Sequence, residues 1–240
     1  MNPKLIQKIV SYQPSASTIA LIQQTPIIFL VGISGAGKDS IKQKLLETGK
    51  YHHIVSHTTR QPRLNRGVME EDGSEYHFID LAEAEKMLND GAFVEAKMYS
   101  GNLYGTSVAE IQKAKDEGKI ALTDIEVQGV AAYKALAPSV KAAFILPPSY
   151  EVWQERLRKR YGGTINPADY HRRMQTATLE LGQLLTTDYY KCFINNSLDK
   201  AVAEIDRFAT TGDRDPTQEA KARALAKKLV EETQTELSGL

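Results

Sequence analysis

The chain has 240 residues, of which 42% are hydrophobic and 25% are charged, a composition typical of a globular protein large enough for a substantial core. Its 30 Lys and Arg residues balance its 30 Asp and Glu residues, so no overall positive field would gather nucleic acid or an anionic membrane. No apolar stretch reaches the length of a membrane span, no signal-peptide pattern opens the chain, and there is a single cysteine, Cys192; we therefore expect a cytoplasmic protein with no membrane or nucleic-acid partner.

Residues 1–25 precede the first predicted strand and are expected to form an N-terminal extension that packs on the surface. Apolar residues at helical spacing between positions 5 and 10 predict a short amphipathic helix. Pro14 and the Ser and Thr residues around it predict that helical structure stops there.

The most informative segment is the apolar run 26–31, which leads directly into a glycine-rich turn and a lysine. A strand, a turn of this kind and a helix form the arrangement in which backbone N–H groups surround phosphates at a helix N-terminus. The helix is predicted after the turn and closes at Gly49. The candidate phosphate-binding residues are Gly32, Ser34, Gly35, Ala36, Gly37, Lys38, Asp39 and Ser40.

The position after the lysine departs from the usual motif, because Asp39 replaces the Ser or Thr that ligates Mg²⁺. Asp39 can supply a carboxylate oxygen to the metal, or it can repel the phosphate while Ser40 takes over as the ligand. The sequence leaves both alternatives open.

Residues 51–107 change character, with short alternating segments at 53–57, 76–79 and 93–98 and a turn at Gly101-Asn102. This pattern predicts a small insertion of strands. Within it, Asp80 and Glu83 form a capping box for a helix that ends at Gly91.

Strands and helices then alternate to residue 194. Ser107 with Glu110 begins a helix that stops at Gly118, the strand 119–124 ends in Asp124, and further strands are predicted at 142–146 and 190–194. Helices are predicted from Gln128, from Ser149 and at 167–185. The alternation predicts an α/β fold with a parallel-sheet core that has helices on both faces, and Cys192 is expected to be a small apolar residue on a strand.

The end of the chain is predicted to be separate. Thr210 to Arg214 resemble a hinge-like linker, and Asp215-Pro216 begin a polar helix carrying Leu225, Leu229 and Val230. We expect this helix to rest on the core with a solvated outer face.

Six sequence blocks occur in the order in which they occur in guanylate kinases. The segment Val55-Ser56-His57-Thr58-Thr59-Arg60-Gln61-Pro62-Arg63 resembles the monophosphate-binding signature of that family. The other blocks are Tyr76-His77-Phe78, Phe93-Val94-Glu95, the segment 100–107, the segment 124–130 and the segment 195–199. The resemblance covers about Ile27 to Phe208.

The resemblance implies a P-loop nucleoside monophosphate kinase fold over residues 26–209, with a mobile GMP-binding insertion at about 54–107 and an arginine-bearing lid at about 156–178; residues 210–240 form a linker and helical extension. It implies that GMP, and dGMP as well, is phosphorylated by ATP in the presence of Mg²⁺, which gives ADP and the nucleoside diphosphate. By position it implies that Ser56, Arg60, Arg63, Tyr76, Glu95, Tyr104, Thr106 and Asp124 bind GMP, that Asn195 joins the ATP-binding residues, and that Arg156, Arg160 and Arg173 are lid arginines.

Phosphoryl transfer joins two polyanions, and its transition state spreads charge over equatorial oxygens. Arg60 and Arg63 are three residues apart and can both bind the acceptor phosphate as bidentate donors, and Arg60 joins Lys38 and the lid arginines as a catalytic candidate. Considered without the motif, these two arginines are surface residues paired with Glu70, Glu71 or Asp72.

Guanine presents N1–H and N2–H₂ donors beside its O6 acceptor, so a carboxylate matches it. Glu95 is the candidate for those donors, and the Ser56 and Thr106 hydroxyls can serve O6. Asp124 ends a strand at the carboxyl edge of the sheet, where it can orient Mg²⁺ waters or the acceptor nucleotide, whereas Glu126 is either a ligand or a helix cap.

Arg156 and Arg160 are one helical turn apart and share a face. The segment 161–167 departs from the family pattern, so the third lid arginine is Arg173 or Arg172. The stretch 64–74 is longer than the corresponding stretch of the family. This departure bears on how the loop closes, not on which base the site selects. Two alternatives remain, a non-catalytic binding module of the same fold and a kinase with another phosphate acceptor; Asp39 is the feature that leans towards the module.

Overall fold

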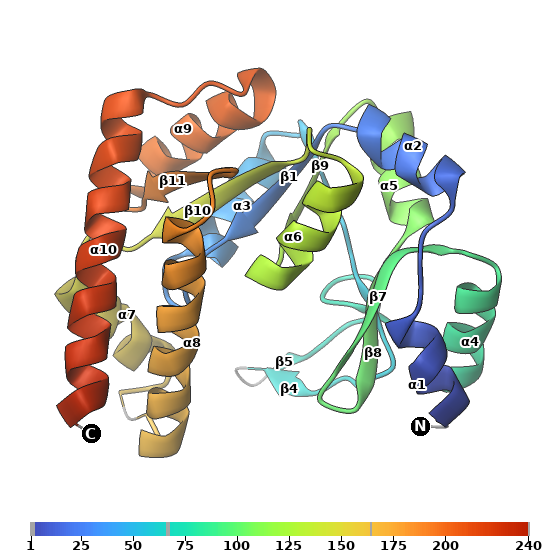
Figure 1. Cartoon of the computed structure of the whole chain (residues 1–240), viewed down its shortest axis with the longest axis horizontal. Helices are drawn as coiled ribbons and strands as arrows, with labels where there is room; N and C mark the ends of the chain where they lie inside the picture. The colour runs from blue at the N-terminus through green and yellow to red at the C-terminus, as the bar shows by residue number, and fades with distance from the viewer. Residues whose placement is uncertain (1–2, 66–67, 164, 240) are drawn as a thin grey trace. The chain divides into compact units, whose positions relative to one another are not determined.

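The computed structural model describes residues 3–65, 68–163 and 165–239. The chain divides into two compact units, whose elements are labelled in Figure 1. Unit 1 comprises Met1–Pro26, Tyr51–Thr123 and Lys134–Ser139, and unit 2 comprises Ile27–Lys50, Asp124–Tyr133 and Val140–Leu240.

The core of unit 2 is a set of parallel strands in the order β11-β10-β1. β1 (Ile27–Val31) pairs with β10 (Lys141–Leu146), and β10 pairs with β11 (Tyr190–Ile194), with Leu30 opposite Ala143 and Phe144 opposite Cys192. All five residues of β1 are buried, as expected for a strand covered on both faces. Cys192 is buried in β11, which confirms that it packs as an apolar residue.

The helices of this unit begin where local sequence signals place them. The Ser149 hydroxyl accepts from Val152 N at the start of α7, and the Asn166 side chain accepts from Ala168 N at the start of α8. The helices are α3 (Lys38–Glu47), α6 (Val127–Leu136, which ends in unit 1), α7 (Tyr150–Arg160), α8 (Pro167–Leu185), α9 (Leu198–Thr211) and α10 (Pro216–Gly239). The predicted alternation of strands and helices is thus confirmed.

The connection between α9 and α10 is anchored, in contrast to the expected hinge. α9 continues through Thr211 and ends at Gly212 in the left-handed conformation. The Arg214 guanidinium is only 5% exposed; it donates to Cys192 O at 2.6 Å and pairs with Glu204 at 2.6 Å. Charge and polarity made this segment look like a linker, but its arginine is bound to the edge of β11.

α10 packs against α8 and β11, so the expected contact of the last helix with the core is confirmed. Its buried residues are Ala222, Ala226, Leu229 and Thr233. Arg223 donates to Tyr190 O at 2.9 Å and to Leu184 O at 3.2 Å.

Unit 1 contains a four-stranded sheet in the order β6-β3-β8-β7. Its strands are β3 (His57–Thr58), β6 (His77–Phe78), β7 (Phe93–Tyr99) and β8 (Asn102–Ser107). β7 and β8 are antiparallel, and their register shifts between Phe93 and Glu95. β2 (Tyr51–His53) pairs in parallel with β9 (Ile120–Asp124), whose last residue belongs to unit 2. The insertion of strands is therefore present, together with an unexpected antiparallel pair of short strands, β4 (Leu64–Asn65) and β5 (Val68–Met69).

The helices of unit 1 include one that the sequence analysis missed. They are α1 (Pro3–Val10), α2 (Ala16–Gln24), α4 (Leu81–Asn89) and α5 (Val108–Asp116). The Ser15 hydroxyl accepts from Thr18 N and so begins α2, where we had expected helical structure to stop. Leu21 and Ile22 are buried, so tertiary packing supports a segment whose polar residues favour a break. Among the described residues, no helix is both long and apolar enough to cross a membrane.

Candidate active site

The turn after β1 needs glycine at two positions for reasons of space. Gly32 has φ +135°, and a Cβ atom there would lie 2.3 Å from Ile145 O. Gly37 has φ +97°, and its Cβ would lie 2.2 Å from Asn195 Nδ2. Asn195 is buried and donates to Ala36 O at 2.9 Å, so it fixes the loop from the end of β11. The backbone of the loop is therefore packed tightly against β10 and Asn195, and it leads directly into the first turn of α3. Anion binding uses the backbone N–H groups of such a loop together with the helix N-terminus.

Lys38 is folded over its own loop. Its ammonium group donates to Gly32 O and, at 3.4 Å, to Ile33 O. Burial lowers the pKa of Lys38. A cation held against neutral carbonyl groups in this way can exchange them for phosphate oxygens at little conformational cost.

Two carboxyl groups near Lys38 have pKa values shifted in opposite directions. Burial raises the pKa of Glu180 on α8 to about 7; Lys38 opposes this effect and Glu126 adds to it. Burial also tends to raise the pKa of Asp124, but Lys42, whose ammonium lies 2.6 Å from Oδ1, brings it below its usual value. Asp124 was predicted with the GMP-binding residues; here it belongs to unit 2 and is paired with Lys42.

Three arginines contact the loop or its helix. Arg156 donates to Asn195 O at 2.9 Å and to Ala36 O at 3.4 Å. Arg173 donates to the Ser34 hydroxyl at 3.4 Å, and Arg160 lies 3.9 Å from the Asp39 carboxylate. These are the three predicted lid arginines. Arg172 instead pairs with Asp169 and is 70% exposed, so Arg173 is the one that reaches the loop.

The second set of predicted residues lies in unit 1 and centres on Arg60 and Arg63. Glu70 binds both, at 2.8 Å to Arg60 Nη1 and 3.5 Å to Arg63 Nε, and also accepts from Arg63 N at 3.1 Å. Its side chain is 3% exposed, and the hydrogen bond from Arg60 lowers its pKa. The two arginines therefore do pair with an acidic neighbour, as expected for them without the motif. This pairing brings both guanidinium groups to one carboxylate.

Arg60 keeps donors for a further anion. Its Nη1 is used by Glu70 and Gln61 O, whereas Nε and Nη2 are buried and have no hydrogen-bond partner among the described residues. The guanidinium carbon lies 5.2 Å from the centre of the Tyr76 ring, which in turn contacts Tyr104 at 5.7 Å. Two adjacent N–H groups of a guanidinium match the oxygens of a phosphate.

Glu95 lies on β7 directly opposite Thr106 of β8. Its Oε1 accepts from Thr106 N at 3.1 Å, and burial raises its pKa. Ser56 is half-buried just before β3, and its carbonyl accepts from His77 N at 2.9 Å. Unit 1 therefore contains the predicted monophosphate and guanine residues except Asp124, on the strands of its sheet or in the segments that adjoin them.

Three neighbours of these sites were missed from the sequence, namely Glu70, Glu180 and Lys42. Lys42 gave a usable signal, since it lies one helical turn after Lys38 and shares its face. Glu70 was considered only as a surface partner, and Glu180 is one of many polar residues on a long helix, so nothing in the local pattern distinguished it.

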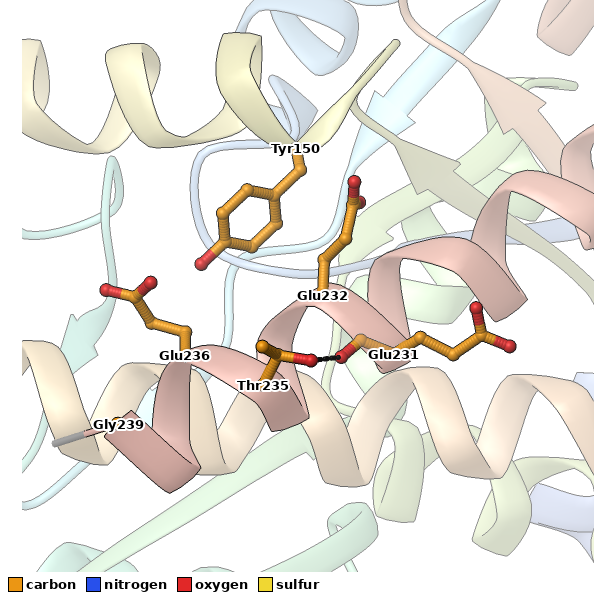
Figure 2. Close-up of a pocket in the computed structure, with 6 residues that line it drawn as sticks. All are labelled: Tyr150, Glu231, Glu232, Thr235, Glu236 and Gly239. Atoms are coloured by element: carbon orange, nitrogen blue, oxygen red, sulfur yellow. Dashed lines mark hydrogen bonds between the residues drawn. The ribbon is translucent and has the colours of Figure 1, made fainter.

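A pocket of about 460 Å³ lies between α7 and α10, and none of the predicted site residues lines it. Figure 2 shows the residues that do. Its walls are Tyr150, Glu231, Glu232, Thr235, Glu236 and Gly239. Three carboxylates make it unsuited to a nucleotide phosphate. Within the described ranges, no group of three His, Cys, Asp or Glu residues could hold a metal ion by itself.

Comparisons with known proteins agree on one family. The sequence model of the guanylate kinase family matches residues 23–211. The guanylate kinase of Bdellovibrio bacteriovorus is 36% identical over 185 residues, which cover 77% of this chain and 96% of that protein. The guanylate kinase of Schizosaccharomyces pombe is 34% identical over 209 residues, covering 86% and 97%. The crystal structure of the guanylate kinase from Anaplasma phagocytophilum aligns with a TM-score of 0.56 at 25% identity, covering 81% of this chain and 90% of that one.

Proposed function

Because the chain belongs to the guanylate kinase family, we propose that it transfers the terminal phosphoryl group of ATP to GMP, and also to dGMP, to give ADP and the nucleoside diphosphate. The observation that carries this proposal is the family match over residues 23–211, which includes the loop 32–38, Arg60 just after β3 and Glu95 on β7.

The triphosphate is assigned to unit 2. The backbone N–H groups of the loop surround the phosphates, and Lys38 leaves its carbonyl partners to bind them. Ser34, Arg156, Arg160 and Arg173 supply further donors, which the contacts of the three arginines with the loop and its helix support. Asn195 holds the loop in the conformation that this requires.

The monophosphate is assigned to unit 1. Arg60 offers Nε and Nη2 to the acceptor phosphate, and Arg63, Tyr76 and Tyr104 add donors around it. Glu95 accepts from N1–H and N2–H₂ of guanine, with Ser56 and Thr106 on the O6 side. Asp124 of unit 2 is also proposed to bind GMP, and Lys42 beside it lowers the pKa of its carboxyl group.

These residues need no general base. An oxygen of the acceptor monophosphate is already anionic at neutral pH, so the chain's task is to bring the two phosphates into line and to neutralise charge that develops on the transferred group. Lys38, Arg60 and the lid arginines perform that task as fixed cations.

Mg²⁺ is proposed as the metal that accompanies ATP. It commonly takes one or two protein oxygens beside phosphates and water. The first turn of α3 offers the exposed Ser40 hydroxyl and the Asp39 carboxylate, which is 64% exposed, so the donor set fits such an ion. When bound, the metal would neutralise charge on the phosphates.

We propose a mobile GMP-binding insertion at about 54–107, a lid at about 156–178 and a C-terminal extension from 210. ATP and GMP are the proposed small-molecule partners. The cytoplasmic location stays a prediction.

A coupled assay of ADP release tests the function, with Mg²⁺-ATP and each of GMP, dGMP, AMP, CMP and UMP. We expect turnover with GMP and dGMP and at least about 10⁴-fold lower kcat/KM with AMP, since the wrong base leaves buried polar groups unpaired. Equal turnover of AMP and GMP would refute the role of Glu95. Absence of turnover on every acceptor would favour a non-catalytic binding module.

A further inference from the structure

The N-terminal segment outside the matched family residues completes the core of unit 1. Leu5 and Ile9 of α1 are 5% and 1% exposed. They pack with Leu88 of α4 and with Phe93 and Leu103 of the sheet. α1 contacts both β7 and α4, and Figure 1 shows it beside α4 and the paired ribbons of β7 and β8. Residues that the family pattern does not include are therefore structural parts of this unit.

Tyr12, just after α1, is hydrogen-bonded to a single residue of β7 in two ways. Its hydroxyl donates to Phe93 O at 2.6 Å and accepts from Phe93 N at 3.2 Å. A phenol can do both at once, because it has one donor and two acceptor sites. Burial raises the pKa of Tyr12, so the donor proton stays in place throughout the neutral range.

Phe93 is also where the β7–β8 register shifts. Phe93 is opposite Ser107, whereas Glu95 is opposite Thr106, so Val94 is an extra residue in β7. Such a bulge bends a strand and re-aims the side chains that follow it. Phe93 and Val94 are both fully buried, and Glu95 then reaches Thr106 N across the strands.

We infer that Tyr12 is a positioning residue for guanine recognition: its hydroxyl fixes the bulge at Phe93 and thereby sets where the Glu95 carboxylate lies. The inference rests on the proposed function, in which Glu95 accepts from the base. Tyr12 is not among the residues proposed to contact the nucleotides; it acts through the backbone of β7.

The variant Tyr12→Phe tests the hydroxyl separately from the ring. The ring lies edge-on to Phe93, with centroids 6.3 Å apart and planes at 88°, and phenylalanine keeps that contact. Removing the hydroxyl takes away both bonds to Phe93 and leaves the bulge free to relax.

Steady-state kinetics with GMP and with IMP, which lacks the N2 amine, give the readout. For Tyr12→Phe we expect KM for GMP to rise about 5- to 20-fold and the ratio of kcat/KM for GMP over IMP to fall several-fold, because two hydrogen bonds of modest net strength are lost. The KM for ATP is expected to stay within twofold.

Two control variants separate positioning from packing. Ser11→Ala removes a neighbouring hydroxyl whose bond is local, to Gln7 O at 2.9 Å, and should change nothing. Leu5→Ala removes core volume and should lower the Tm while leaving the GMP-to-IMP ratio unchanged. A Tyr12→Phe protein that has a lower Tm but the wild-type ratio would overturn the inference.

Hydrogen exchange on the wild-type protein provides a test that does not depend on the variant's folding. Saturating GMP should slow exchange of the amides at 93–95 at least about tenfold, and an ATP analogue should not. Unchanged exchange at these amides in a protein that does phosphorylate GMP would refute the inference. A wild-type protein that does not phosphorylate GMP would instead refute the proposed function.

Discussion

The substitution Glu180→Gln should stabilise the protein in alkaline solution. Burial raises the pKa of Glu180 from its usual 4.5 to about 7, and the nearby Lys38 only partly compensates. The folded state therefore binds this proton more tightly than the unfolded state. The stability that Glu180 contributes through this proton is fully present below pH 4.5 and is lost as the pH rises through 7.

The size of the effect follows from the pKa difference. The step from 4.5 to about 7 corresponds to about 3 kcal/mol at about 1.4 kcal/mol per pH unit. Glutamine keeps the shape of the side chain and never ionises. The variant should therefore exceed the wild type in free energy of unfolding by up to about 3 kcal/mol at pH 8.5, and this advantage should disappear near pH 4.5.

Urea unfolding of both proteins at intervals from pH 4.5 to 8.5 measures this difference. Glu231→Gln, at an exposed position on α10, is the matched control and should give a difference that varies by less than about 0.5 kcal/mol over the range. A Glu180→Gln difference that stays constant from pH 4.5 to 8.5 would show that this carboxyl is not protonated near neutrality, and the reasoning would fail.

Four further outcomes are expected. Lys38→Ala should lower kcat by about 10²–10³-fold, because a cation is lost from the transferring phosphates, while calorimetry finds GMP affinity within twofold of wild type. Glu95→Gln should raise KM for GMP by about 10²-fold. Because burial raises the pKa of Glu95, the KM of the wild type for GMP should begin to rise on acidification at a higher pH than the titration of an exposed glutamate would produce. A KM that stays constant from pH 8 to 5 would contradict this role of Glu95. His57, whose pKa burial lowers to about 4, stabilises the fold above pH 6.5 and loses that contribution as the pH falls towards 4; His57→Asn should lessen the acid-induced fall in Tm measured by circular dichroism. Asp39→Ser should tighten Mg²⁺ binding in the presence of an ATP analogue severalfold if the aspartate repels the phosphate, and weaker binding in a Mg²⁺ titration would instead make it a ligand.

Features encoded in contiguous residues were predictable from the sequence. The strand 27–31, the turn up to Lys38 and the start of α5 at Ser107 each follow from local patterning, turn chemistry or capping, and each is present in the structure. The two loop glycines Gly32 and Gly37 could also be expected from the turn itself, because both have positive φ, although the atoms that a Cβ would meet there belong to Ile145 and Asn195, far along the chain.

Features that depend on residues far apart in the chain were not predictable. α2 forms because Leu21 and Ile22 are buried, although its polar residues favour a break. The Tyr12 hydroxyl meets Phe93, which is 81 positions away in the sequence. Glu70 looks like an ordinary surface acid until the fold buries it against Arg60. The anchored segment at Arg214 was misjudged for the same reason.

The anchoring of α10 bears on how this protein can be shortened. A chain cut at residue 211, where the family match ends, would lose Arg214 and Arg223 and leave the carbonyl oxygens of Cys192, Leu184 and Tyr190 without these donors. The cut would also remove the buried residues Ala222, Ala226 and Leu229 and uncover the faces of α8 and β11 on which α10 packs. Truncation at residue 211 should therefore destabilise unit 2, and a shortened protein should keep α10 although the family match ends before it.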